Sequence, residues 1–151
     1  APPLVAAHLT PRPQVELGTL LAAHGVSSMD DISDGLASEV HEIAAASKVG
    51  MVIDAAKIPL APELIAASKF LGKPPLDYAL YGGEDYQLLV TLSPETFDRL
   101  IKEFGANILT PIGRVVPSAE GVLLVADDGQ ASPLAPHGYN HFINADRGDI
   151  L

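Results

Sequence analysis

The sequence of 151 residues has no cysteine, few basic residues and no long apolar run. Without cysteine there is no disulfide framework, no thiolate nucleophile and no cysteine-based zinc site, which is compatible with a reducing compartment. No apolar run approaches the roughly 18–20 residues of a membrane-spanning helix, and the N-terminus lacks the pattern of a signal peptide. These absences predict a soluble, cytoplasmic protein without membrane contacts.

Basic residues are outnumbered two to one by acidic ones. Nine Lys and Arg stand against 19 Asp and Glu, which gives a net charge of −10. Nucleic-acid affinity depends on clustered Lys and Arg, and here the basic residues are dispersed, so nucleic acid is not an expected partner. If this protein binds phosphates, we expect divalent metals held by carboxylates to offset the charge.

Two common catalytic motifs are also missing. The sequence has no Gly-x-Ser-x-Gly elbow, which argues against a serine hydrolase. It has no Gly-x₄-Gly-Lys-Ser/Thr phosphate loop either. A phosphoryl-transfer function would therefore have to rest on carboxylates and metal.

The residues that are present predict one folded domain. Hydrophobic residues make up 48% of the chain, and Gly and Pro are scattered rather than gathered in tracts, which excludes wholesale disorder. The chain opens at Ala1 without an initiator Met, which indicates a fragment, a processed form or one part of a longer protein.

Hydrophobic spacing and turn residues predict a mixture of helices and strands. In the helix that begins at Leu36, Val40 and Ile43 line an apolar face, whereas Glu39 and Glu42 line a polar one. The last two strands flank a turn at 117–121 and predict a hairpin, so we expect an α+β sandwich, a mixed sheet with flanking helices. The predicted helices are 14–24, 36–50, 62–72, a short one after Pro75, and 93–105; the predicted strands are 28–33, 51–53, 86–91, 108–116 and 121–126.

The densest polar cluster is the aspartate segment, residues 30–35, which reads Asp-Asp-Ile-Ser-Asp-Gly. Strand alternation places Asp31 and Ser33 on one face, with Asp34 at the exit into a helix, where open α/β sheets bind ligands. Carboxylate and hydroxyl oxygens there suit Mg²⁺. The alternative is that Asp34 is the N-cap of the helix, while Asp30 and Asp31 are solvated turn residues.

The second cluster is the diglycine segment, residues 81–86, which reads Tyr-Gly-Gly-Glu-Asp-Tyr. Paired glycines allow a close backbone approach or a positive φ. Glu84 is then placed to accept hydrogen bonds from the amino group or ring of a ligand. The alternative is a tight turn with an exposed acidic tip.

Together and in this order, the two segments resemble the thiamine-monophosphate kinase family. Three further segments also resemble that family: His8-Leu9 with the prolines at 11 and 13, residues 112–115 and residues 138–142. The resemblance implies a lead-in at 1–7, a domain at 8–142 and a tail at 143–151. It also implies a C-terminal domain of the kind shared with aminoimidazole ribonucleotide synthetase and selenophosphate synthetase.

The resemblance implies transfer of the γ-phosphoryl group of ATP to thiamine phosphate. By the same resemblance, Asp31 and Asp34 bind Mg²⁺, Ser33 contacts the nucleotide, and Glu84 and Tyr139 contact the thiamine moiety. No catalytic residue is assigned. The family's separate N-terminal domain supplies further metal ligands, much of the nucleotide site and the main contact of a homodimer, so this chain alone is expected to be inactive.

The chemistry agrees with the residues, because phosphoryl transfer needs mainly positioning and charge neutralisation by Mg²⁺. The acceptor is already an anionic phosphate, so no strong general base is required. A function of a different class stays open: a non-catalytic substrate-binding or scaffold domain of a related ATP-dependent synthetase.

Overall fold

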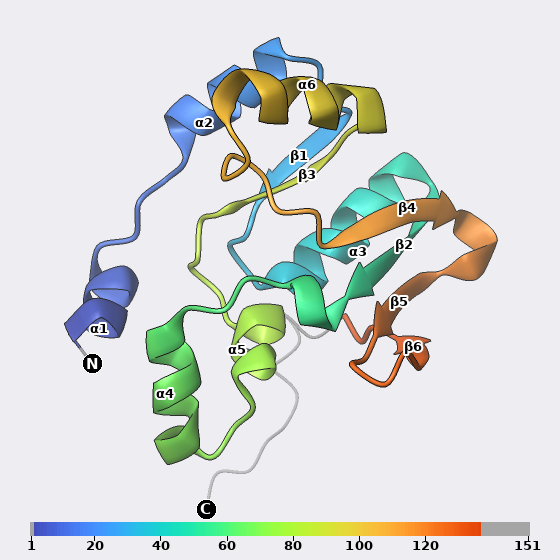
Figure 1. Cartoon of the computed structure of the whole chain (residues 1–151). Helices are drawn as coiled ribbons and strands as arrows, with labels where there is room; N and C mark the ends of the chain where they lie inside the picture. The colour runs from blue at the N-terminus through green and yellow to red at the C-terminus, as the bar shows by residue number, and fades with distance from the viewer. Residues whose placement is uncertain (1, 137–151) are drawn as a thin grey trace, which may run out of the picture.

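The computed structural model describes residues 2–136 and contains two sheets with helices around them (Figure 1). One helix, α3, lies between the two sheets and contacts strands of both. In chain order the helices and strands are α1 (Pro2–Leu9), α2 (Val15–Ala23), β1 (Ser28–Asp31), α3 (Leu36–Ser47), β2 (Val49–Asp54), η1 (Ala55–Lys57), α4 (Pro62–Leu71), α5 (Pro75–Tyr81), β3 (Leu88–Thr91), α6 (Pro94–Phe104), β4 (Gly113–Pro117), η2 (Ser118–Glu120), β5 (Val122–Val125) and β6 (Ala131–Pro133).

The strands form a two-stranded and a four-stranded sheet. In the first, β1 and β3 are antiparallel, with Asp31 opposite Leu88 at one end. In the second, the order is β4-β2-β5-β6, and β2 is antiparallel to β4 but parallel to β5. The predicted α+β class with mixed strand directions and flanking helices is confirmed, although the strands divide between two sheets.

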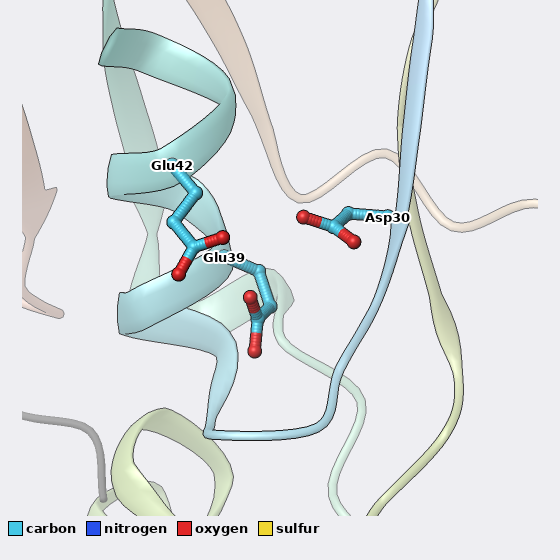
Figure 2. A group of neighbouring side chains, drawn as sticks. All are labelled: Asp30, Glu39 and Glu42. Carbon is cyan, nitrogen blue, oxygen red and sulfur yellow. The ribbon is translucent and has the colours of Figure 1, made fainter. Parts of the chain in front are cut away.

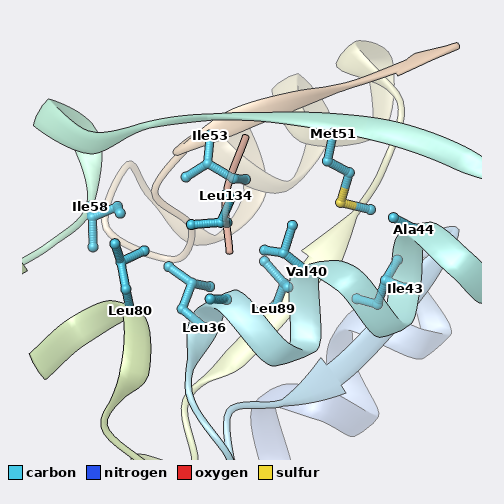
Figure 3. Packing of buried hydrophobic residues seen from close by; sticks show 11 residues of the cluster. Leu36, Val40, Ile43, Ala44, Met51, Ile53, Ile58, Leu80, Leu89 and Leu134 are labelled. Atoms are coloured by element: carbon cyan, nitrogen blue, oxygen red, sulfur yellow. The ribbon is translucent and has the colours of Figure 1, made fainter. Parts of the chain in front are cut away.

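The core forms where the apolar side of α3 faces β2 (Figure 3). Val40 and Ile43 lie on α3 as the helical spacing predicted, and β2 contributes Met51 and Ile53. Burying one such side chain stabilises the fold by about 1.5–3 kcal/mol. Residues from α5, from β3 and from the position after β6 close the cluster: Leu80, Leu89 and Leu134.

The predicted hairpin between the last two long strands is wrong, because β4 and β5 lie on opposite sides of β2. The connection between them crosses the start of β2 at Gly50, which has no side chain in the way. A Cβ at Gly50 would lie 2.5 Å from the carbonyl oxygen of Gly121 and 2.7 Å from that of Pro117. A hairpin does join β5 and β6, with a turn at 127–129.

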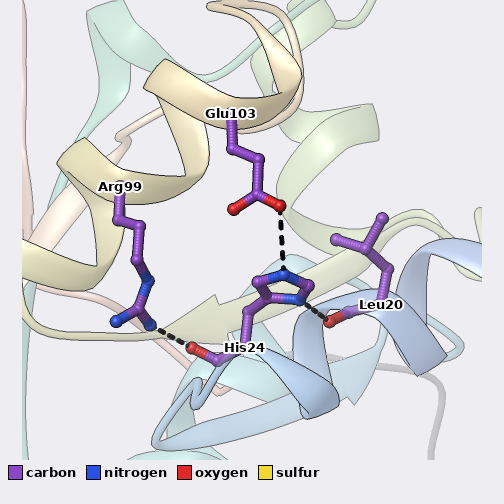
Figure 4. Close-up of polar contacts among 4 residues, drawn as sticks. All are labelled: Leu20, His24, Arg99 and Glu103. Carbon is purple, nitrogen blue, oxygen red and sulfur yellow. Dashed lines mark hydrogen bonds and ion pairs between the residues drawn. The ribbon is translucent and has the colours of Figure 1, made fainter.

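Helices α2 and α6 lie together over the two-stranded sheet, joined through His24 (Figures 1 and 4). The guanidinium of Arg99 donates to the carbonyl oxygen of His24 at 2.6 Å, and Nε2 of His24 lies 3.7 Å from Oε1 of Glu103. The hydroxyl of Ser93 caps α6 by accepting from the N–H of Thr96 at 3.2 Å.

Helix α1 occupies the lead-in for which no secondary structure was predicted, and it contacts α4. Its prolines stand in the first turn, where the N–H that proline lacks has no helical partner. Among the residues that the structure describes, none of the helices has both the length and the apolar character to cross a bilayer.

Candidate functional site

The aspartate and diglycine segments, about fifty residues apart in sequence, are joined by backbone hydrogen bonds. The N–H of Ile32 donates to the carbonyl oxygen of Gln87 at 2.8 Å, and Ile32 accepts from the N–H of Tyr86 at 2.8 Å. Beyond them, the N–H of Glu84 donates to the carbonyl oxygen of Ser33 at 2.7 Å. The structure therefore brings together the two segments that the sequence marked as candidate sites.

Both strands are shorter than predicted at this junction. Strand β3 starts at Leu88 rather than at residue 86, because Tyr86 has a φ of 58° and Glu84 a φ of 62°, which are incompatible with an extended strand. Strand β1 ends at Asp31, and Ser33 lies in the bend that follows it. Positive φ at a residue other than glycine is uncommon and is concentrated at functional sites.

Gly83 is the point of closest approach between the two segments. A Cβ on Gly83 would lie 2.7 Å from the carbonyl oxygen of Ser33, a distance that a real Cβ does not tolerate. The absence of a side chain there lets the next residue, Glu84, reach the same oxygen through its N–H. The close backbone approach expected from paired glycines is therefore present.

Glu39 is the site residue that the sequence placed wrongly. It was assigned to the polar face of its helix, but it is buried, with 2% of its surface exposed. Its Oε1 accepts from the N–H of Asp34 at 2.9 Å and from that of Ser33 at 3.2 Å. Burial raises the pKa of Glu39, while these two hydrogen bonds act in the opposite direction. An acid in the first turn of a helix that reaches back to earlier N–H groups is the signal that would have found it.

The alternative role of Asp34 as a helix cap is wrong. The N-cap of α3 is Gly35, and no side chain caps this helix end. The half-buried Asp34 contributes only its backbone N–H to Glu39. Its carboxylate is thus not required for starting α3.

A group of three acids lies between β1 and α3 (Figure 2). Asp30 points from β1 toward the helix, where Glu39 and Glu42 stand, and their ligand oxygens all lie within 4.8 Å of one another. Asp31, the next residue, is exposed because successive side chains of a strand point to opposite faces. The group gathered by the fold therefore differs from the pair, Asp31 and Asp34, predicted to bind metal.

The donor set of the predicted pair fits Mg²⁺. Within residues 2–136, no hydrogen bond or ion pair involves the carboxylate oxygens of Asp31 or Asp34, so no other protein group occupies these hard oxygen atoms. In the three-acid group, by contrast, one oxygen of Glu39 already accepts two hydrogen bonds.

A cavity of about 520 Å³ opens beside the diglycine segment. Gly83 and Glu84 line one side of it, and the N-terminal stretch, including His8 and Arg12, lines the other. Glu84 is exposed and therefore accessible to a ligand in this cavity. Tyr139, the other residue predicted to contact substrate, lies outside the described residues.

The whole arrangement can be compared with known proteins. A family model described as "AIR synthase related protein, C-terminal domain" matches residues 2–126. The chain belongs to this family. Its resemblance to thiamine-monophosphate kinases is also confirmed: the chain is 36% identical over 140 residues to that of Bacillus subtilis and 37% identical over 139 residues to that of Aquifex aeolicus.

These alignments include most of the chain but less than half of each relative. They cover 89% and 92% of the chain, and 41% of each of the two kinases. Among solved structures, one described as AaThiL complexed with AMPPCP and TMP has a TM-score of 0.75 and 35% identity over 92% of this chain and 41% of that one. The chain therefore spans about two fifths of the length of the curated relatives it matches.

A more distant structure, the hydrogenase maturation protein HypE, shares the fold of this AIR synthase related domain. It has a TM-score of 0.60 and 22% identity, and it covers 78% of the chain and 39% of HypE. The fold alone does not select one activity.

Proposed function

We propose that this chain is the C-terminal domain of a kinase that transfers the γ-phosphoryl group of ATP to thiamine phosphate, giving thiamine diphosphate and ADP. The observation that carries the proposal is the junction of the aspartate and diglycine segments, with Glu84 beside an open cavity. Similarity to thiamine-monophosphate kinases supports it, as does a related structure that holds AMPPCP and TMP.

In this proposal, the residues divide the work between the two substrates. Asp31 and Asp34 hold Mg²⁺, and Ser33 contacts the nucleotide. Glu84 and Tyr139 contact the thiamine moiety, with Glu84 accepting hydrogen bonds from an amino group. Bound Mg²⁺ supplies charge neutralisation between the reacting phosphates. The residues of this chain bind and orient, because the acceptor phosphate oxygen is already anionic.

The proposal includes further parts. A separate N-terminal domain supplies more metal ligands and much of the nucleotide site, in agreement with the greater length of the relatives. That domain also provides the main contact of a homodimer, and the enzyme works in the cytoplasm.

The test is Asp34→Asn in the full-length gene product, with ADP release measured in the presence of thiamine phosphate. Loss of a metal-holding carboxylate is expected to lower turnover about 100-fold or more. The fold is expected to persist, because Asp34 contacts Glu39 through its backbone N–H, which Asn retains.

The matched control is Asp98→Asn, the same change at an exposed position of α6. It is expected to leave turnover unchanged. Near-normal turnover of Asp34→Asn would remove Asp34 from the metal site, and ADP release that does not depend on thiamine phosphate would contradict the proposed acceptor.

A non-catalytic binding or scaffold domain is the second candidate, and the 41% coverage of the relatives favours it for the chain taken alone. Calorimetry of the 151-residue chain with Mg-ATP and with thiamine phosphate separates the two. Nucleotide binding of ordinary strength without any further domain would argue against a mere scaffold.

A further inference from the structure

We propose that Glu39 is a positioning residue of the phosphoryl-transfer site: through hydrogen bonds it fixes the backbone of Ser33 and Asp34, and through Ser33 it also fixes Glu84. This inference rests on the function proposed above. It assigns a role to a side chain that is buried behind the site rather than exposed to substrate.

The first step is the pair of hydrogen bonds between Glu39 and the backbone of the aspartate segment. One oxygen, Oε1, accepts from two successive N–H groups, at 3.2 Å from Ser33 and 2.9 Å from Asp34. Both N–H groups precede α3, so the helix provides no backbone acceptor for them. Hydrogen bonds to a carboxylate are roughly twice as strong as neutral ones, and burial keeps water from replacing them.

The second step leads from Ser33 to the diglycine segment. The N–H of Ser33 donates to Glu39, and its carbonyl oxygen accepts from the N–H of Glu84 at 2.7 Å. Glu84 has a φ of 62°, a conformation that persists only where its surroundings enforce it. The bond to Ser33 is part of that enforcement, so a displacement of Ser33 displaces Glu84 as well.

The third step concerns the free energy that it costs to keep the Glu39 carboxylate buried beside two other acids. Oxygens of Asp30 and Glu42 lie within 4.8 Å of an oxygen of Glu39, so like charges face one another beside a buried group. An apolar side chain of similar size would avoid both the desolvation and the repulsion. An apolar side chain cannot accept hydrogen bonds from the two N–H groups. We therefore infer that the unfavourable burial of the carboxylate serves to hold the backbone of the aspartate segment.

The experiment compares Glu39→Met with Glu39→Gln in the full-length gene product. Met has a similar volume but no acceptor, whereas the side-chain carbonyl of Gln can accept both hydrogen bonds without charge. Amide hydrogen exchange in the aspartate segment (30–35) and the diglycine segment (81–86) is measured by mass spectrometry, together with kcat, the KM for thiamine phosphate and the melting temperature.

Glu39→Met is expected to speed amide exchange in both segments about tenfold or more, to lower kcat about tenfold and to raise the KM for thiamine phosphate. Glu39→Gln is expected to stay within about threefold of wild type in each quantity. The matched control, Ile43→Val on the same helix, is expected to lower the melting temperature while leaving exchange in the two segments and the KM unchanged.

Three outcomes would overturn the inference. They are unchanged exchange in Glu39→Met, an equal rise of the KM in Ile43→Val, and a Glu39→Gln variant that loses activity while exchange stays slow, since the charge itself would then be the requirement. If Glu39→Met does not fold, Glu39→Asp is used instead. Its side chain is one methylene shorter, so its carboxylate should no longer reach the N–H groups of Ser33 and Asp34, and exchange in both segments should rise. A wild-type protein that does not phosphorylate thiamine phosphate would refute the proposed function alone, because exchange still decides whether Glu39 holds both segments.

Discussion

The two sides of α3 are built by different physical means. On one side, Val40 and Ala44 belong to the apolar cluster that includes Met51 and Ile53 of β2, and burial of apolar surface holds the elements together (Figure 3). On the other side, toward β1 and Asp30 (Figure 2), the carboxylate of Glu39 accepts hydrogen bonds from the backbone N–H groups of Ser33 and Asp34. The first side is stabilised in proportion to the apolar area it buries, and the second depends on the direction of its hydrogen bonds.

This difference shows where the fold obtains stability and where it obtains a defined site. Apolar packing is non-directional, so the β2 side tolerates changes that keep volume and patterning. Hydrogen bonds weaken steeply with angle and distance, so the other side fixes an irregular backbone that includes the positive φ of Glu84 and Tyr86. Substitutions on the two sides should therefore separate stability from substrate binding.

Ile53→Ala is expected to have the largest effect on stability. Ile53 is 3% exposed and lies in the core cluster, so its truncation leaves a cavity and should lower the free energy of unfolding by about 3 kcal/mol. Urea unfolding of the 151-residue chain measures this loss. In the full-length protein, the KM for thiamine phosphate should stay at the wild-type value, and a rise comparable to that of a site variant would break the separation of the two sides.

Gly83→Ala is expected to lower stability less than Ile53→Ala does but to weaken the binding of thiamine phosphate. The added Cβ would lie 2.7 Å from the carbonyl oxygen of Ser33 and force the two segments apart. We expect a loss of about 1–2 kcal/mol in the free energy of unfolding and about a tenfold rise in the KM for thiamine phosphate. Both are measured as for Ile53→Ala.

Gly18→Ala in α2 is the control for that substitution. Its Cβ would make contacts no closer than 3.6 Å, and alanine is the better helix former, so stability should rise by about 0.5–1 kcal/mol with the KM unchanged. An unaltered KM in Gly83→Ala would mean that the contact between the two segments does not set substrate binding.

The sequence predicted best what is local. Helices expected at 14–24, 62–72 and 93–105 correspond to α2, α4 and α6, because spacing and capping signals lie within each element. It failed for strand partners: the pattern that predicts strands near β4 and β5 does not say that both pair with β2 rather than with each other. That arrangement depends on a crossing over Gly50, a contact distant in sequence.

The site follows the same division. Composition and order marked the aspartate and diglycine segments, and the structure joins them through Ser33 and Glu84. Helical periodicity assigned Glu39 to the polar face of its helix, because periodicity separates apolar from charged residues and carries no information on which charged residue is buried. The neighbouring bend at Ser33 and Asp34 decides its burial instead, and that bend is a tertiary feature. The metal role of Asp31 and Asp34 stays a prediction.

The smallest expected effect concerns a carboxylate at the end of β2, whose environment is the reverse of that of Glu39. Asp54 lies 2.9 Å from Nζ of Lys57, and this hydrogen bond and ion pair lower the pKa of Asp54. A lowered pKa in the folded state means that the pair contributes stability above the pKa of the unfolded chain, about 3.9, and loses it as the pH falls through the folded value. Lys57→Met should therefore lower the urea midpoint slightly at about pH 7, and the difference from wild type should vanish under strongly acidic conditions. A difference that persists in acid would assign the effect to packing of the Lys57 stem rather than to its charge.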